Sequence, residues 1–272
     1  MKIVLFDLDE TLGYFTQFGI FWDSLNFYFK GTQDLTQDDF NETLDLYPEY
    51  LRPHIIPILN YLKHKKMSKC CNKLMIYTNN QGPRKWADQL ISYFESKIKF
   101  KLFDQIIAAF KVNGKRIEIC RTTHDKTYND LIKCTKIPLN TEICFLDDNF
   151  FPEMSNQNVF YINVKPYFHD ISFQAMIKKF INSRIGKKLV SESDKNFETD
   201  FLKIIKSYKY IVSEKNNNEY EVDKILSKQI MIHLQEFFER TPNQIPGSHK
   251  KRSHTRMNRE KMNKRNKTLK KY

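Results

Sequence analysis

Residues 2–12 of the chain read KIVLFDLDETL, and this stretch decides the fold. Its first part is an apolar run without polar alternation, which is typical of a β-strand covered on both faces. The run ends at Asp7 and Asp9, so both carboxylates should emerge at the carboxyl edge of a parallel sheet, where open α/β sheets bind ligands. Taken alone, the segment also fits a plain strand followed by an acidic turn.

Three further segments follow in a fixed order. A second apolar run at 74–77 ends in Thr-Asn-Asn at 78–80, and a third at 143–146 ends in Asp-Asp-Asn at 147–149. Between them, Lys126 opens a stretch with apolar residues at helical spacing. We therefore expect two acidic strand ends, one Thr/Asn strand end and one lysine to meet at the same sheet edge.

This order of motifs resembles the haloacid dehalogenase (HAD) superfamily, whose members carry a strand-end DxDx[TV], a strand-end Ser or Thr, a Lys and a strand-end acidic pair. The resemblance covers residues 1–184. DLDETL at 7–12, Arg52-Pro53 ahead of an apolar helix and LDDN at 146–149 are most similar to FCP-like phosphatases, the RNA polymerase II C-terminal-domain and NLI-interacting-factor type. The chain differs from that type at Asn129, where a lysine is usual.

The resemblance implies an α/β fold with a Rossmann-like core, in which a central parallel sheet is flanked by helices. Residues 1–184 would form this phosphatase core. Residues 13–50 would be a small helical and aromatic insertion that acts as a minimal cap. The segment 81–125 has room for one helix, one strand and a connector, so no large second cap fits there. The aromatic residues of 13–50 fit either plain core packing, which we favour, or a recognition lid.

The resemblance also implies a role for each motif residue. Asp7 would be the nucleophile that forms an aspartyl-phosphate, and Asp9 the general acid and base. Thr78 and the N–H of Asn79 would bind phosphoryl oxygens. Lys126 would neutralise charge on Asp7 and on the phosphoryl group. The implied metal ligands are the side chains of Asp7 and Asp148 and the backbone carbonyl of Asp9, with Asp147 in support.

One of these roles, that of Lys126, has competitors in the sequence. Arg121, Lys115 and Lys133 compete with Lys126 for the third motif, and in a lysine-rich chain a solvated surface lysine is the default interpretation. Thr11 follows a strand end, where a hydroxyl often only caps a turn.

The acidic residues themselves predict a bound cation. If four carboxylates converge, their mutual repulsion protonates some of them unless cations are present. Oxygen ligands without a His/Cys cluster favour Mg²⁺ over Zn²⁺.

The composition of the chain limits the classes of protein to which it can belong. No Gly-rich nucleotide-binding loop is present, and no apolar stretch approaches transmembrane length. The first apolar run is broken at Asp7, which argues against a signal peptide. We expect an intracellular protein, cytoplasmic or nuclear, and no membrane partner. The five cysteines lack metal-ligand spacing and are expected to be structural thiols of a reducing compartment, with Cys144 in a buried strand.

The amino-acid pattern of the chain changes after residue 182. A linker is predicted at 183–188, and apolar residues at helical spacing predict a helical hairpin over 197–240 that docks on the core or binds a partner. The segment 241–272 holds eleven Lys/Arg and one acid, a net charge of +10, which leaves +3 of the total +13 for residues 1–240. This basic tail is expected to be disordered when free.

The predicted function is a Mg²⁺-dependent phosphomonoester hydrolase (phosphatase), with a phosphorylated macromolecule, above all a phosphoprotein, as its substrate. A nucleic-acid-end phosphatase is the first alternative. The basic residues of 247–272 would then hold the polymer; they also fit a nuclear signal, a tether to an acidic partner or a tail that only adds solubility. A non-catalytic HAD-fold binding protein is the second alternative.

Overall fold

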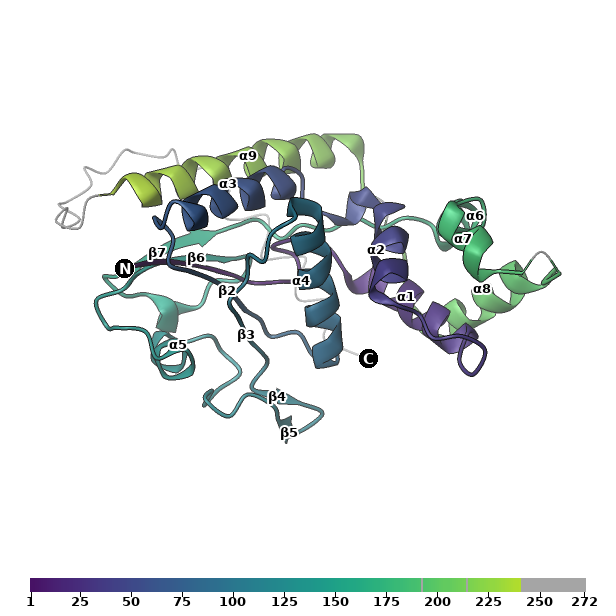
Figure 1. Ribbon diagram of the computed structural model, residues 1–272, viewed down its shortest axis with the longest axis horizontal. Coiled ribbons are helices and arrows are strands. Elements are labelled where there is room, and N and C mark those ends of the chain that lie inside the picture. Colours follow the sequence, from purple (N-terminus) through teal and green to yellow (C-terminus); the bar gives the residue numbers. More distant parts are fainter. Residues whose placement is uncertain (192, 214, 241–272) are drawn as a thin grey trace, which may run out of the picture. The chain divides into compact units, whose positions relative to one another are not determined.

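The central sheet has five parallel strands in the order β3-β2-β1-β6-β7, with β1 in the middle (Figure 1). The computed structural model describes residues 1–191, 193–213 and 215–240. Its sheet consists of β1 (Lys2–Phe6), β2 (Lys73–Tyr77), β3 (Gln105–Ile107), β6 (Glu142–Asp147) and β7 (Val159–Asn163). The α/β class and the central parallel sheet are therefore confirmed, and the three apolar runs are β1, β2 and β6. The predicted basic tail, 241–272, lies outside the described residues.

Both faces of β1 are covered. Val4 and Phe6 lie in one hydrophobic cluster, whereas Ile3 and Leu5 lie in another. Successive strand residues point to opposite sides of a sheet, so a strand buried on both sides needs apolar residues throughout. This explains why the first apolar run shows no polar alternation.

Helices lie on both faces of the sheet and beyond one end of it (Figure 1). They are α1 (Thr16–Tyr28), α2 (Gln37–Asp45), α3 (Ile55–Met67), α4 (Arg84–Ile98), α5 (Tyr128–Thr135), α6 (Phe173–Ile181), α7 (Arg184–Leu189), α8 (Phe197–Ser207) and α9 (Asn217–Glu239), with 3-10 turns at Pro48–Tyr50 and Pro152–Met154. The core on one side includes Leu59 of α3, Leu90 of α4 and Leu234 of α9, and the core on the other includes Leu131 of α5. Within the described ranges, none of the helices is both long and apolar enough to cross a membrane.

The segment 13–50 folds into α1, α2 and a 3-10 turn. Phe18 and Phe21 of α1 are fully buried, and Trp22 is nearly so, whereas Phe27 is 64% exposed. Phe21 contacts Phe201 of α8 edge to face, with ring centroids 5.2 Å apart. The aromatic residues of this segment therefore serve mainly as core, as favoured from the sequence.

One predicted helix start is wrong by two residues. The apolar helix expected after Arg52-Pro53 begins at Ile55, in agreement with the sequence. The helix expected from Lys126 begins at Tyr128, because the hydroxyl of Thr127 caps it from outside. Both basic residues therefore precede their helices, where their side chains reach the loops at the sheet edge.

Two connections contain more structure than predicted. The linker expected at 183–188 is wrong, because these residues form most of α7, and the hydroxyl of Ser183 accepts the N–H of Gly186 at 3.0 Å to cap it. The segment 81–125 contains, besides α4 and β3, a small hairpin of β4 (Lys111–Val112) and β5 (Lys115–Arg116).

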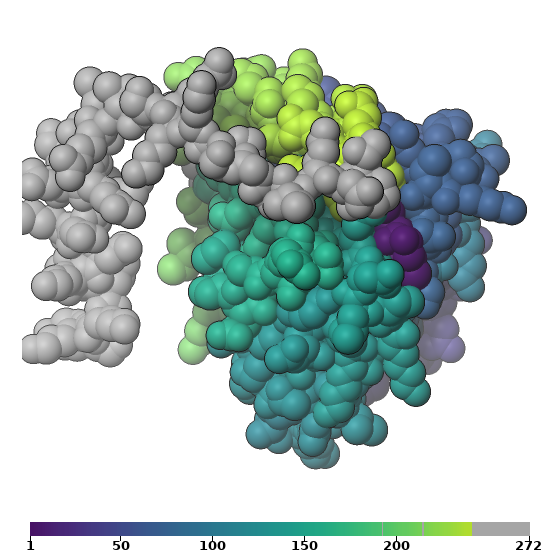
Figure 2. Space-filling model, turned by 90° about the vertical axis from the view of Figure 1, so that its left-hand side faces the viewer, coloured from purple at the N-terminus to yellow at the C-terminus, as the bar shows by residue number. Residues whose placement is uncertain are grey.

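The two helices predicted over 197–240 exist, but they pack separately instead of forming a hairpin. α8 packs against α1 and α6. α9 lies beside α3 and the start of β1, as the yellow-green, blue and purple atoms of Figure 2 show. There Lys2 Nζ donates to the carbonyl of Phe237 at 2.8 Å, and Phe238 contacts the ring of Tyr61. Docking on the core, the more favoured of the two expectations, is observed for both helices.

The cysteines differ in part from expectation. Cys120 and Cys134 form a disulfide that joins the segment before α5 to the last turn of this helix. Cys144 is a buried thiol in β6, as predicted, while Cys70 is exposed and Cys71 is buried.

Candidate active site

The turn after β1 is held in one conformation by backbone contacts. The N–H of Asp7 donates to the carbonyl of Leu146 at 2.8 Å, which extends the β1–β6 pairing to the first carboxylate. Glu10 has a φ of 60°, and its N–H donates to the carbonyl of Gly13 at 2.7 Å. A Cβ at Gly13 would lie 2.5 Å from the carbonyl oxygen of Tyr50, so only glycine fits there.

Arg52 holds the same turn through its guanidinium. It is 2% exposed and donates to the carbonyls of Glu10 and Thr11, each at 2.5 Å, and of Lys165 at 2.8 Å. Burial lowers the pKa of Arg52 to about 10, so the group stays charged at neutral pH. The sequence singled out Arg52 only through the family resemblance, and its backbone partners become visible only in the fold.

Three of the predicted carboxylates meet at the ends of β1 and β6. Asp7, Asp147 and Asp148 each place a carboxylate oxygen within 4.8 Å of the others. Asp147 is fully buried and Asp7 is 7% exposed. Thr11 does more than cap a turn, because its hydroxyl donates to Asp148 Oδ1 at 3.2 Å and accepts the N–H of Asp148 at 3.1 Å.

Lys126 bridges two of these carboxylates. Its Nζ lies 2.5 Å from Asp7 Oδ1 and 2.6 Å from Asp147 Oδ2, and the residue is 1% exposed. Of the competitors for this position, Lys115 and Lys133 are exposed, and the guanidinium of Arg121 contacts backbone carbonyls instead of these acids. Among the four candidates, Lys126 is therefore the residue that reaches the acidic cluster.

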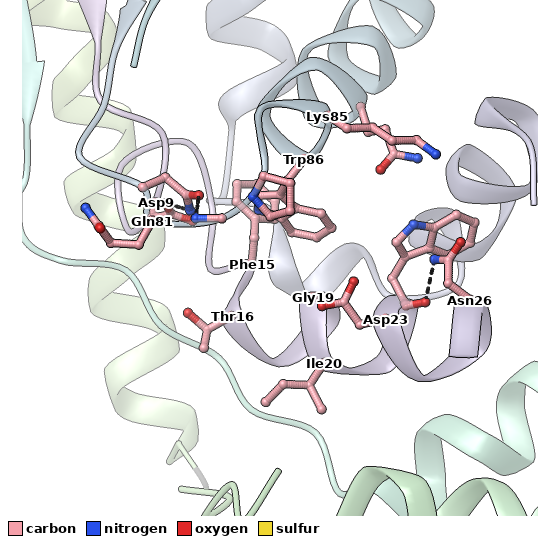
Figure 3. Close-up of a pocket in the computed structure, with 15 residues that line it drawn as sticks. Asp9, Phe15, Thr16, Gly19, Ile20, Asp23, Asn26, Gln81, Lys85 and Trp86 are labelled. Carbon is pink, nitrogen blue, oxygen red and sulfur yellow. Dashed lines mark hydrogen bonds between the residues drawn. The ribbon is translucent and has the colours of Figure 1, made fainter. Parts of the chain in front are cut away.

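Asp9 lines an open cleft (Figure 3) and is not one of the three clustered carboxylates. Its Oδ2 accepts the side-chain amide of Asn80 at 2.6 Å. The cleft has a volume of about 430 Å³ and lies between α1 and the start of α4, with Gly19 and Trp86 among its lining residues. Burial raises the pKa of Asp9 to about 7; the hydrogen bond from Asn80 opposes this shift, and the charge of Asp7 adds to it.

Thr78 and Asn79 follow directly after β2. Thr78 is 3% exposed, and its hydroxyl accepts the N–H of Asn80 at 3.0 Å. Asn79 lines a second hollow of about 420 Å³ together with Lys126 and Phe150. The two expected phosphate-binding residues therefore lie at the same sheet edge as the acidic cluster.

The acidic cluster carries excess negative charge. Burial raises the pKa of Asp147 although the ammonium of Lys126 opposes the shift, and burial together with the charge of Asp7 raises the pKa of Asp148. Burial alone would lower the pKa of Lys126, but the charges of Asp7 and Asp147 raise it above its ordinary value. Three carboxylates thus cluster beside one ammonium group, which contacts two of them, Asp7 and Asp147.

This donor set fits a hard divalent cation. Asp7 and Asp148 offer carboxylate oxygens at the end of the sheet, and Asp148 is partly exposed, so solvent or a substrate can complete a ligand shell there. The side chain of Asp9 is not part of this cluster.

Comparison of the sequence with protein-family models and with curated proteins finds no match. The function of the site must therefore be inferred from the chemistry of its residues. Two residues of the site, Asn80 beside Asp9 and Arg121 behind Thr78, were given no such role from the sequence. Asn80 was visible as part of the strand end, whereas the partners of Arg121 are backbone atoms that leave no sequence pattern.

Proposed function

We propose that the chain is a Mg²⁺-dependent phosphatase of the haloacid dehalogenase superfamily, nearest to its FCP-like members, that hydrolyses a phosphomonoester through an aspartyl-phosphate on Asp7. One observation carries the proposal: a buried lysine joins Asp7 to Asp147, while Asp9, two residues along the same turn, faces an open cleft. The residues that we assign as nucleophile and as proton donor are thus two positions apart on one turn.

The chemistry assigned to these residues has two steps. A carboxylate oxygen of Asp7 attacks phosphorus, the ester bond from phosphorus to the leaving oxygen breaks, and Asp9 gives its proton to that oxygen. Asp9 then takes a proton from a water molecule that attacks the aspartyl-phosphate, which releases inorganic phosphate and restores Asp7. The raised pKa of Asp9, about 7, suits a group that alternates between acid and base near neutral pH.

The other residues bind and balance charge. Lys126 holds Asp7 in place and offers positive charge beside the phosphoryl group. The hydroxyl of Thr78 and the N–H of Asn79 are the proposed phosphoryl ligands. Asp7, Asp148 and the Asp9 carbonyl would hold Mg²⁺, which when bound neutralises carboxylate and phosphoryl charge.

The lining of the site favours a phosphoprotein over a nucleic acid. The two hollows at the site and a third beside them are lined by four acids and three bases, namely Asp9, Asp23, Asp125 and Glu153 against Arg84, Lys85 and Lys126. A polyanion requires a basic track, because most of its binding energy comes from neutralised phosphates. The mixed lining suits a peptide that carries a single phosphate.

The experiment that tests this proposal is hydrolysis of a generic aryl phosphate by the full chain and by Asp7→Asn, each with Mg²⁺ and with EDTA. We expect turnover that needs Mg²⁺ and that falls at least about 1,000-fold in Asp7→Asn, because the nucleophile is lost. Asp88→Asn, the same change at an exposed position on α4, is the matched control and should keep full activity. Metal-independent turnover, or equal turnover in Asp7→Asn, would contradict the proposal.

A further inference from the structure

Arg121 is a fully buried cation that is held by backbone atoms. It is 0% exposed, and it forms no ion pair with an acid of the described residues. Its guanidinium donates instead to the backbone carbonyls of four residues, which are Thr78 at 3.1 Å, Ala108 at 2.9 Å, His124 at 2.9 Å and Asp125 at 3.2 Å. The ring of Tyr77 lies against it, 4.9 Å from ring centroid to guanidinium carbon.

Two of these carbonyls belong to peptide units of the candidate site. The carbonyl of Thr78 shares a peptide unit with the N–H of Asn79, and the carbonyl of Asp125 shares one with the N–H of Lys126. In a planar trans peptide, the C=O and N–H bonds point to opposite sides. By binding the Thr78 carbonyl, Arg121 therefore turns the N–H of Asn79 to the side away from the guanidinium.

The N–H of Asn79 is available on that side. It has no hydrogen-bond acceptor among the described residues. Asn79 and Lys126 line the same hollow of about 420 Å³. One guanidinium thus holds both the strand end with the free N–H and the segment that carries the buried ammonium.

We propose that Arg121 is a positioning residue, which aims the N–H of Asn79 and the side chain of Lys126 at the phosphoryl oxygens of the substrate. This inference rests on the proposed phosphatase function, and it adds a residue that touches no reacting atom. A cation that binds a peptide carbonyl also polarises the peptide, which strengthens its N–H as a donor.

The chemistry of arginine suits this task. A planar guanidinium presents five N–H donors in a rigid fork, so it can bind several carbonyls in fixed directions. Lysine keeps the charge but concentrates its donors on one nitrogen atom, which cannot span the same carbonyls. Arg121 is itself fixed, because Arg116 donates to its carbonyl at 2.8 Å and the neighbouring Cys120 is tied to α5.

The test compares Arg121→Lys with the full-length wild type in Mg²⁺-dependent aryl phosphate hydrolysis, alongside thermal unfolding. We expect kcat to fall about 100-fold, the size of effect seen when one oxyanion donor is lost, with KM changed much less. Thr122→Val is the matched control, because it removes a hydrogen bond from Thr122 to Asp130 in the same segment without touching Thr78 or Lys126. This control should lose stability and keep kcat.

A second readout separates this inference from the phosphatase proposal. The backbone amide resonance of Asn79 should shift on addition of inorganic phosphate with Mg²⁺, and the shift should shrink in Arg121→Lys. If the wild type turns over no ester but Asn79 still shifts in an Arg121-dependent way, the phosphatase proposal fails and the positioning role stands. If Asn79 of the wild type does not shift, or if Arg121→Lys folds and keeps kcat, the positioning role is wrong. Should Arg121→Lys fail to fold, Arg121→Gln, which keeps a side-chain amide donor without the charge, replaces it in both measurements with the same expected outcomes.

Discussion

At the scale of single residues, Lys126 controls the charge state of the site. Its ammonium group lies between Asp7 and Asp147, and all three side chains are at most 10% exposed. A buried carboxylate that loses its cation keeps the desolvation cost without the compensating attraction. The same lysine that would neutralise the phosphoryl group therefore also stabilises the folded protein in the absence of metal.

Replacing Lys126 by methionine tests this double role. We expect Lys126→Met to lower the free energy of unfolding by about 3–5 kcal/mol in EDTA, because two buried carboxylates lose their partner. Urea unfolding measures the change. Lys133→Met, on the exposed side of α5, should leave the stability unchanged within about 0.5 kcal/mol. Equal stability of Lys126→Met and wild type would show that Lys126 does not hold these acids.

The residues of the site were predictable to different degrees. Asp7 and Asp147 follow apolar runs, so their place at the sheet edge follows from strand patterning alone. Lys126 was preferred to Arg121 only through the family resemblance, because strand and helix patterning does not distinguish two cations that precede the same helix. Only the fold reveals that one reaches carboxylates and the other reaches carbonyls.

At the scale of elements, α2 begins with a reciprocal cap. The hydroxyl of Thr36 accepts the N–H of Asp39, and the carboxylate of Asp39 accepts the N–H of Thr36 at 2.9 Å. Lys188 of α7 donates to the same carboxylate at 2.6 Å. Asp39 therefore connects the start of α2 to the segment that was expected to be a linker.

We expect Asp39→Asn to reduce stability in a pH-dependent way. Burial alone would raise the pKa of Asp39, but the bonds from Lys188 and Thr36 lower it below its ordinary value. The carboxylate thus stabilises the fold above the ordinary pKa, about 3.9, and this stabilisation is lost as the pH falls through the lowered folded pKa. The variant should be about 1 kcal/mol less stable at neutral pH and approach the wild type in strong acid. A difference in unfolding free energy that is independent of pH would contradict this account.

The cleft between α1 and α4 offers a second test at this scale. Gly19 faces Trp86 across it, and a Cβ at Gly19 would lie 3.5 Å from the Trp86 ring, an ordinary contact. We expect Gly19→Leu to raise KM for bulky aryl phosphates and to spare small acyl phosphates, because the larger side chain fills the cleft. The helix should not suffer, since leucine favours helix over glycine. Gly19→Ala is the control. If Gly19→Leu has the wild-type KM for every substrate, the cleft does not take part in substrate binding.

Helices and strands that follow from a local sequence pattern were predicted from the sequence. The contacts between these elements, which depend on packing, were not. The runs at 3–6 and 74–77 were predictable as buried strands, because an all-apolar stretch of this length must be covered on both faces. The stripes on α8 and α9 indicated helices but not their partners. α8 packs against α1 and α9 lies beside α3, since those surfaces exist only once the sheet has formed.

At the scale of the whole molecule, the proposed metal ligands come from two strands that are 141 residues apart in sequence, at Asp7 and Asp148. A cation that binds only this assembled edge must stabilise the fold by mass action. We expect Mg²⁺ to raise the free energy of unfolding by about 2.7 kcal/mol when its free concentration is about 100 times the Kd. Thermal unfolding of wild type and Asp148→Asn measures this, and the variant should respond weakly. An equal response of both proteins would place the cation elsewhere.

The central claim is that Asp7 carries the phosphoryl group, and trapping that group tests it most directly. In Asp9→Asn the base for the second step is missing, whereas an aryl phosphate with an acidic phenol as its leaving group needs no proton donor in the first step, so the aspartyl-phosphate should accumulate. Acid quenching followed by borohydride reduction converts a phosphorylated aspartate to homoserine, which fragment mass spectrometry locates within the peptide. We predict homoserine at position 7 after incubation with aryl phosphate and Mg²⁺, and unchanged aspartate at 147 and 148. Modification at another position, or none in a variant that still consumes one equivalent of substrate, would contradict the mechanism.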